Sequence, residues 1–299
     1  MKKAIGIDLG GTSIKGGLID EGGNILKKAE KDTLTANGRY EVLERISEVI
    51  NMLMEDGVMG IAIGSPGFID SNEGKVLKVG GNIHDWAGTK IKDELQKKHP
   101  NMSIFVENDA NVAAICEHWK GAAKGYENFI MLTLGSGLGG AIYIENHGLV
   151  RGHRYRGGEL GHAIYIPGGK LCTCGQRGCA EQYISGNAVE NAYEEKTGIK
   201  KKGRDIFKSI SKDDIANEVI HSFSQNLGIY ITTLKNMFDP ECIVIGGGVI
   251  NSKEYWWDDT IKSFKNHSND SEDIDIVPAK YLNDAGMIGA GKIVFDRLR

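Results

Sequence analysis

AIGIDLGGTSIKGGLIDEGGNILKKAEKD, residues 4–32, predicts how the fold begins. Its segments 4–8, 13–20 and 25–32 are rich in β-forming residues, and glycine-rich turns separate them. Short runs of this kind, bounded by glycine, are typical of strands joined by tight turns. We therefore expect a meander of three strands at this end of the chain.

The stretch NFIMLTLGSGLGGAIYIENHGLV, residues 128–150, repeats this order of strand, glycine turn, strand, polar turn and strand. Signals for helices and strands follow each copy, with apolar residues at helical spacing or in nearly continuous runs. We interpret the copies as a duplicated α/β unit that builds two lobes. The other predicted elements are helices at 39–54, 109–121, 213–238 and 283–298, and strands at 58–64, 103–108 and 241–250.

The composition is that of an ordinary globular protein, with 299 residues, 40% hydrophobic and 25% charged. Lys and Arg are scattered and the formal net charge is -4, so nucleic acid and anionic membranes are not expected partners. Asp8 interrupts the N-terminal apolar run, and no run approaches the roughly 20 apolar residues of a membrane span. The five cysteines do not indicate a disulfide framework, which favours a reducing cytoplasm.

Three glycine-rich loops follow predicted strands: DLGGTS at 8–13, GSGLGG at 135–140 and IGGGV at 245–249. GSGLGG matches the dinucleotide fingerprint, but a strand-like segment follows it where that fingerprint requires a helix, so we reject this assignment. Glycine lets backbone N–H groups approach phosphate oxygens, although each loop could also be a plain hairpin turn. Asp8 could hold Mg²⁺ beside phosphates or cap its own turn. The hydroxyl groups that could add donors are those of Thr12, Ser13 and Ser136.

Polar side chains mark two further places in the chain. In VENDANVAAI, residues 106–115, Asn108 and Asp109 lie where a strand meets a helix, and Asx residues there commonly cap the helix. The functional alternative is that Asp109 accepts the proton of a hydroxyl that attacks a phosphoryl group, while Asn108 holds a neighbouring hydroxyl. Glu159 and Glu181 could bind the hydroxyls of a neutral polyol or could be solvated surface charges.

The stretch ELGHAIYIPGGKLCTCGQRGCAE, residues 159–181, contains three of the five cysteines. Structural zinc takes four sulfur or nitrogen ligands in a tetrahedron, and one histidine with three cysteines supplies them. The redox alternative normally uses C-x-x-C at the start of a helix, which this stretch lacks. We expect a structural zinc site formed by His162, Cys172, Cys174 and Cys179.

The motifs DLGGTS, VENDAN, LGSGLGGA, GGELGH, CTCGQRGCAE and IGGGV, in this order, make the chain resemble the ROK family of sugar kinases and sugar-responsive repressors. The resemblance covers essentially the whole chain. It implies an α/β, actin-like (ribonuclease H-like) two-lobed ATPase fold, with sugar and ATP meeting in the cleft. We expect a smaller N-terminal lobe at 1–117, completed by a helix at 284–299, and a larger lobe at 118–283 that carries the zinc motif.

The resemblance also implies roles for single residues. Asp109 corresponds to the catalytic base, and the zinc ligands match the set derived above. The expected sugar contacts are Gly67, Asn108, Glu159, His162 and Glu181. The expected contacts to ATP and Mg²⁺ are Asp8, Gly11, Thr12, Ser13, Ser136, Gly137, Gly247 and Gly248. Ser13 departs from the family pattern, because many members carry Asn there, and its shorter side chain is expected to weaken a phosphate contact. Phe68 and GGNIHDW at 80–86 also differ from the commonest versions, which leaves the identity of the sugar open.

The activity that the resemblance implies is ATP- and Mg²⁺-dependent phosphorylation of the 6-hydroxyl of glucose or a close relative. N-acetylmannosamine or another N-acetylhexosamine, fructose and β-glucosides are the alternative substrates. A sugar-responsive repressor is the alternative class, but the first predicted strand starts by Ala4 and leaves no room before it for a DNA-reading helix-turn-helix. A plain zinc-stabilised binding protein would not account for the glycine loops and Asp109 together. A homodimer is expected, because dimers are the commonest closed assembly.

Overall fold

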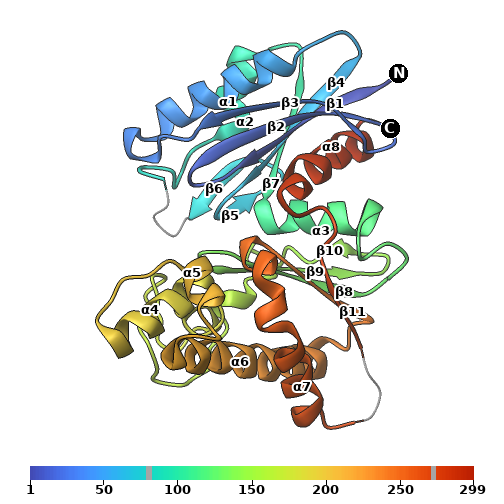
Figure 1. The fold of residues 1–299 in the computed structure, drawn as a ribbon. Helices are drawn as coiled ribbons and strands as arrows, with labels where there is room; N and C mark the ends of the chain where they lie inside the picture. Colours follow the sequence, from blue (N-terminus) through green and yellow to red (C-terminus); the bar gives the residue numbers. More distant parts are fainter. Residues whose placement is uncertain (79–82, 271–273) are drawn as a thin grey trace. The chain divides into compact units, whose positions relative to one another are not determined.

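The chain divides into two compact units in the computed structural model, which describes residues 1–78, 83–270 and 274–299 (Figure 1). Unit 1 comprises Met1–Gly125, Leu149–Gly157 and Asn283–Arg299. Unit 2 comprises Tyr126–Gly148 and Gly158–Leu282. The units are of nearly equal length, and the boundary expected at residue 117 lies inside helix α3 (Asp109–Lys120) of unit 1. The segment 149–157, expected in the larger lobe, also belongs to unit 1.

Unit 1 is built on a five-stranded sheet that begins with the predicted meander. The first three strands pair antiparallel, whereas β1, β4 and β7 run parallel. A two-stranded sheet of β5 (Phe68–Asp70) and β6 (Lys75–Lys78) follows β4 along the chain. The main sheet has the order β3-β2-β1-β4-β7, formed by β1 (Lys3–Leu9), β2 (Ser13–Asp20), β3 (Ile25–Asp32), β4 (Val58–Ser65) and β7 (Ser103–Asn108).

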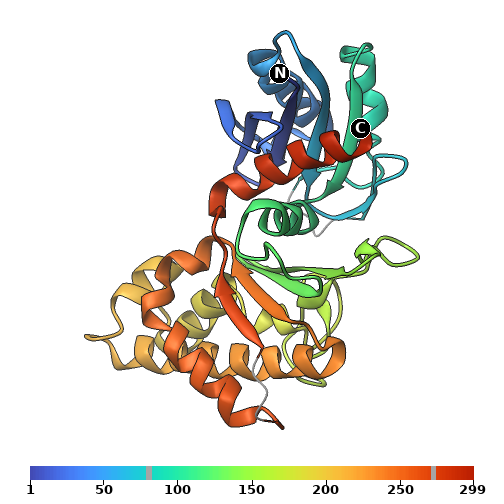
Figure 2. The same cartoon turned by 90° about the vertical axis from the view of Figure 1, so that its right-hand side faces the viewer.

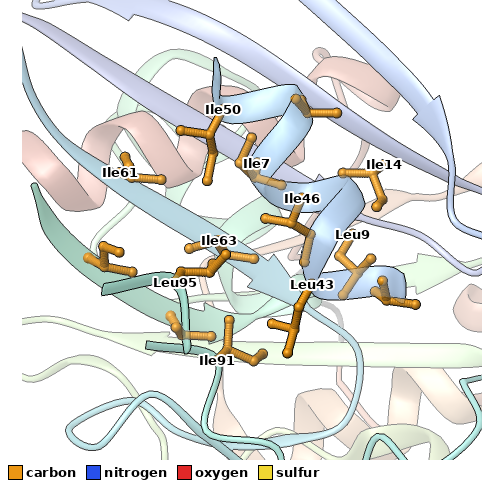
Figure 3. Close-up of a cluster of buried hydrophobic side chains, with 14 of the residues drawn as sticks. Ile7, Leu9, Ile14, Leu43, Ile46, Ile50, Ile61, Ile63, Ile91 and Leu95 are labelled. Carbon is orange, nitrogen blue, oxygen red and sulfur yellow. The ribbon is translucent and has the colours of Figure 1, made fainter. Parts of the chain in front are cut away.

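Helices cover both faces of this sheet. Side chains of neighbouring strand residues point to opposite faces, and a Cβ on Gly16 would meet α1 (Arg39–Leu53) whereas one on Gly17 would meet Met287 of α8 (Ala285–Arg297). On the α1 side, isoleucines and leucines of β1, β2, β4, α1 and α2 (Ile91–Lys98) form a closely packed core (Figure 3). The helix predicted at 39–54 is therefore an amphipathic cover for the meander.

Glycines let α8 approach its neighbours closely, as the small-residue pattern at 283–298 predicts. A Cβ on Gly6 of β1 would overlap the carbonyl oxygen of Met287, and one on Gly289 would overlap the carbonyl oxygen of Val112 in α3. The ribbon shows α8 lying across the strands of unit 1, beside α3 (Figure 2). The C-terminal helix is thus part of the packing that holds β1 and α3 in place.

Unit 2 repeats the strand order of unit 1, which supports the predicted duplication. Its sheet runs β10-β9-β8-β11-β12, in which β8 and β9 are antiparallel and β8, β11 and β12 are parallel. The strands are β8 (Phe129–Leu134), β9 (Leu138–Ile144), β10 (Gly148–Leu149), β11 (Cys242–Gly246) and β12 (Asp275–Pro278). The strand expected at 241–250 is shorter than predicted, because Gly247 takes a φ of 84° and a 3-10 helix, η4 (Gly248–Tyr255), begins there.

The longest helix of unit 2 is α6 (Asp214–Phe238), close to the prediction of 213–238. Asp213 caps it by accepting a hydrogen bond from the backbone N–H of Ala216, and Asp239 ends it in the left-handed conformation. Across the described residues, no helix combines the length and apolarity that crossing a membrane requires. Local sequence patterns did not predict α4 (Gly186–Thr197), α5 (Gly203–Lys208) or α7 (Trp257–His267).

Candidate active site

The carboxyl ends of three parallel strands bring two of the quoted motifs together in unit 1 with the loop SPGFID, residues 65–70, which contains Gly67. In the ladder, Asp8 of β1 pairs with Gly64 of β4, and Ser65 of β4 pairs with Asn108 of β7. The loops DLGGTS, SPGFID and VENDAN therefore leave the sheet at the same edge. Ligand sites of open α/β sheets lie at this edge, where the chain leaves the strands.

Asp109 is the first residue of α3, at the point where β7 ends. Its Oδ1 accepts a hydrogen bond from the N–H of Ala110 at 2.8 Å. Burial of the carboxylate is the main cause that raises its pKa, and the negative charge of Asp8 adds to it, which brings the pKa to about 6. A carboxylate of this pKa is ionised at neutral pH and is basic enough to accept a proton.

Asn108, and not Asp109, is the cap of α3. Its Oδ1 accepts from the backbone N–H of Asn111 at 3.1 Å, so the capping alternative holds for this residue. Its side-chain amide donates to the carbonyl oxygen of Gly67 at 3.1 Å. Gly67 has a φ of 100°, a conformation that favours glycine. The expected sugar contacts Asn108 and Gly67 are therefore joined directly.

Asp8 is the next-to-last residue of β1, close to the glycine turn that follows this strand. Burial raises its pKa, and the positive charge of Lys15 opposes this rise. A Cβ on Gly286 of α8 would overlap the Asp8 carboxylate, so the glycine leaves the space that this side chain occupies. No local sequence pattern predicted this role of Gly286, because it depends on a contact between opposite ends of the chain.

A hydrogen-bonded turn holds Gly11 and Thr12 at the surface of unit 1. The N–H of Gly10 donates to the carbonyl oxygen of Ser13 at 3.0 Å. Thr33, which is buried, donates through its hydroxyl to the carbonyl oxygen of Gly10 at 2.7 Å and through its N–H to that of Thr12 at 2.9 Å. The exposed tip of this turn can approach a phosphate group.

The second and third glycine loops lie beside each other in unit 2, because β8 and β11 are parallel neighbours. Ser136 is exposed in the turn between β8 and β9. A Cβ on Gly247 would overlap the backbone of Leu134, and its positive φ also favours glycine. Gly137 lies in the loop GSGLGG, between β8 and β9, and Gly248 is the first residue of η4. The predicted phosphate and adenosine contacts of this unit thus share one edge of its sheet.

The four predicted metal ligands come together in unit 2. One ligand atom from each of His162, Cys172, Cys174 and Cys179 lies within 4.8 Å of all the others. Nδ1 of His162 is 3.7 Å from Sγ of Cys172, and the Sγ atoms of Cys174 and Cys179 are 3.6 Å apart. Ligands around a tetrahedral zinc ion lie roughly 3.5 to 3.8 Å apart, given the usual bond lengths. The set therefore fits zinc in both chemistry and spacing.

Glu181 connects this metal cluster to the glycine turn of unit 2. Its Oε2 accepts from the N–H of Leu138 at 3.0 Å, and its Oε1 accepts from the thiol of Cys172 at 3.7 Å. A Cβ on Gly137 would overlap Oε2 of the same carboxylate. Glu159 precedes the 3-10 helix η2 (Leu160–His162) and accepts the N–H of His162 through its carbonyl oxygen at 3.1 Å. Both glutamates are thus in contact with residues of the predicted metal cluster, Glu181 with Cys172 and Glu159 with His162.

The residues that depart from the commonest family patterns are only partly described. Phe68 starts β5, directly after Gly67. Of the segment 80–86, residues 80–82 lie outside the described residues. Trp86 is buried and donates through Nε1 to the hydroxyl of Ser65 at 3.1 Å, so this segment supports the loop that contains Gly67.

Two sheets of one topology, each with a glycine turn after its first strand, define the actin-like ATPase fold, which solved structures of related proteins share. The chain belongs to the ROK family, whose model matches residues 4–297. It is 33% identical to the glucokinase of Thermotoga maritima, over 99% of this chain and 98% of that protein. It is also 30% identical to the xylose repressor of Bacillus subtilis, over 98% of this chain and 77% of the repressor.

The solved structure of a ROK family glucokinase from Streptomyces griseus, in complex with glucose and AMPPNP, matches with a TM-score of 0.87. Its sequence identity is 30%, and the match covers 98% of this chain and 99% of that one. The relatives of this chain thus include both kinases and transcriptional repressors.

Proposed function

We propose that this protein is an ATP- and Mg²⁺-dependent kinase that transfers the γ-phosphoryl group of ATP to the 6-hydroxyl of a hexose, with glucose as the expected substrate. The main support is Asp109. Its pKa of about 6 and its position at the ends of the parallel strands suit a base that accepts the proton of a hydroxyl group. The identity to glucokinases along nearly the whole chain supports glucose as the acceptor.

Asp8 would hold Mg²⁺, since this ion prefers a few carboxylate oxygens together with water and phosphate. When bound, Mg²⁺ supplies positive charge that offsets the charge of the phosphate oxygens. The exposed N–H groups around Gly11 and Thr12, and those of the unit 2 turns at Ser136 and Gly248, would bind the phosphates and the nucleoside.

The sugar would be held by Asn108 and the loop of Gly67, together with Glu159, His162 and Glu181. His162 and the three cysteines would hold Zn²⁺, and four protein ligands make this a structural ion. Since Nδ1 of His162 faces the cysteines, Nε2 would carry the proton and could donate to a sugar hydroxyl. Thiolate ligands need a reducing compartment, so we place the protein in the cytoplasm.

The pH dependence of the reaction should report Asp109. A base acts only when ionised, so a raised pKa moves the loss of activity to higher pH than an ordinary aspartate would show. We expect kcat/KM for the sugar to be constant above about pH 7 and to fall tenfold per pH unit below the pKa of about 6. Initial rates at saturating Mg²⁺ and ATP measure this. Residual activity of D109N should lack this limb; the same limb in D109N would assign it to another group.

Sugar-dependent release of ADP separates a kinase from a regulator. We expect ADP release with glucose to exceed that with N-acetylmannosamine, other N-acetylhexosamines, fructose and β-glucosides, measured as kcat/KM across the panel. The formal net charge of -4 gives little attraction to DNA, so mobility-shift assays with sugar-operon DNA should show no specific complex. A specific, salt-resistant shift without ADP release on any sugar would overturn the kinase proposal.

A further inference from the structure

One short segment belongs to a different unit from the chain on either side of it. Residues 149–157 are part of unit 1, whereas 126–148 and 158–282 form unit 2. Within it, residues 151–156, which we name the crossover segment, contact the rest of unit 1 through three side chains. These are Arg151, Tyr155 and Arg156.

Arg151 is the charge partner of a buried carboxylate. Its Nε donates to Oε2 of Glu107 at 2.7 Å, and the Glu107 side chain is 4% exposed while that of Arg151 is 31% exposed. A carboxylate that is buried away from water needs hydrogen-bond donors from the protein. Removal of one partner from a buried ion pair therefore lowers the stability of the fold strongly. The Arg151 side chain is therefore held firmly by Glu107.

The other oxygen of Glu107 holds the turn between β7 and α3. Oε1 accepts from the backbone N–H of Asn108 at 3.0 Å and from the side-chain amide of Asn111 at 2.9 Å. These two residues form the cap of α3, and Asp109 lies between them in sequence. Glu107 thus connects the crossover segment to the turn that presents the proposed base.

The crossover segment also contacts the loop of Gly67. The guanidinium of Arg156 lies 5.2 Å from the centre of the Phe68 ring, a distance typical of a cation–π contact. The hydroxyl of Tyr155 accepts from the side-chain amide of Asn72 at 2.9 Å. Because Phe68 directly follows Gly67, the segment supports both loops that are joined by the hydrogen bond of Asn108.

We propose that Arg151 is a positioning residue for sugar phosphorylation, acting through Glu107 on the turn of Asn108 and Asp109. The inference rests on the proposed kinase function. The crossover segment runs directly into GGELGH, residues 157–162, which contains Glu159 and His162. Residues 151–162 therefore connect Arg151, which contacts Glu107, to the two expected sugar contacts Glu159 and His162. Displacement of these residues should lower kcat/KM for the sugar more than it weakens the binding of ATP.

The test compares Arg151→Met with three variants. R151K keeps a positive charge opposite Glu107. R154M makes the same kind of change at an exposed arginine of the same segment and is the matched control. The double variant E107Q/R151M removes the buried charge that R151M alone leaves unpaired. Each variant is measured for Tm, for kcat and KM of glucose and ATP, and for glucose affinity by calorimetry.

We expect R151M to lower kcat/KM for glucose by about 10- to 100-fold, because small displacements of reacting groups have effects of this size. The KM for ATP should stay within about twofold, R151K should lie between R151M and the wild type, and R154M should match the wild type. In E107Q/R151M the Tm should recover, because no buried charge is left unpaired. The kcat/KM for glucose should stay low, because the contact between residues 151 and 107 that positions the crossover segment is still absent.

Two results would overturn the positioning role. One is an unchanged kcat/KM for glucose in R151M; the other is a recovery of kcat/KM in step with Tm in E107Q/R151M, which would make the ion pair purely structural. A wild type without sugar-dependent ADP release contradicts the kinase function instead. In that case calorimetry still tests Arg151. Equal glucose affinity in R151M and the wild type contradicts the positioning role of Arg151, and so does a wild type that binds no glucose.

Discussion

Asp109→Asn should lower kcat by about 100-fold or more, while the affinities for sugar and ATP stay within a few fold. The amide occupies the same space as the carboxylate, and its oxygen can still accept from the N–H of Ala110. It cannot take up the proton of the attacking hydroxyl. Steady-state rates of ADP release, with binding of both substrates measured by calorimetry, give the two effects separately.

Asp214→Asn is the matched control for this change. Asp214 is the first residue of α6, as Asp109 is the first residue of α3, and it is exposed. Loss of a negative charge at a helix N-terminus weakens the helix by a similar small amount at both sites. Only D109N should lose turnover. Near wild-type turnover in D109N would leave Asp109 with a structural role at the start of α3.

Cys174→Ser should remove the zinc and raise the KM for the sugar by about 10-fold or more, an effect typical of lost metal ligands and their supporting groups. His162 would lose its fixed orientation, and Glu181, two residues beyond Cys179, would lose its anchor. The contact of Glu181 with Leu138 adds a second effect. A hydrogen bond contributes about 1 kcal/mol, so the KM for ATP should rise by about fivefold at most.

The control for this variant is Cys242→Ser, in the buried strand β11 of the same unit. A serine hydroxyl in this apolar position should lower Tm, but zinc content and the KM for sugar should not change. A zinc assay, circular dichroism and kinetics on both variants distinguish loss of the metal from general destabilisation. Tight sugar binding and full activity in C174S without bound zinc would contradict the coupling between metal and sugar.

Local pattern was sufficient to predict the elements that depend on neighbouring residues. The meander at 4–32 and its repeat at 128–150 follow from alternation and glycine turns, and α6 follows from helical spacing. The spacing of the cysteines likewise predicted a cluster that the structure brings within 4.8 Å. Short helices such as α2 and α5 were missed, because a few apolar positions in so short a segment do not distinguish a helix from a loop.

The sequence by itself therefore determined the duplicated α/β order, the glycine turns, the cluster of His162 with three cysteines, and the position of Asp109 at a strand end. Only the tertiary structure decided which distant residues support them: Gly286 beside Asp8, Glu181 on Leu138, and Arg151 on Glu107. The physical reason is that these contacts form only when segments distant in the sequence pack together, as α8 does against β1. Residue type and spacing along the chain did not identify these partners, which lie 43 or more residues apart.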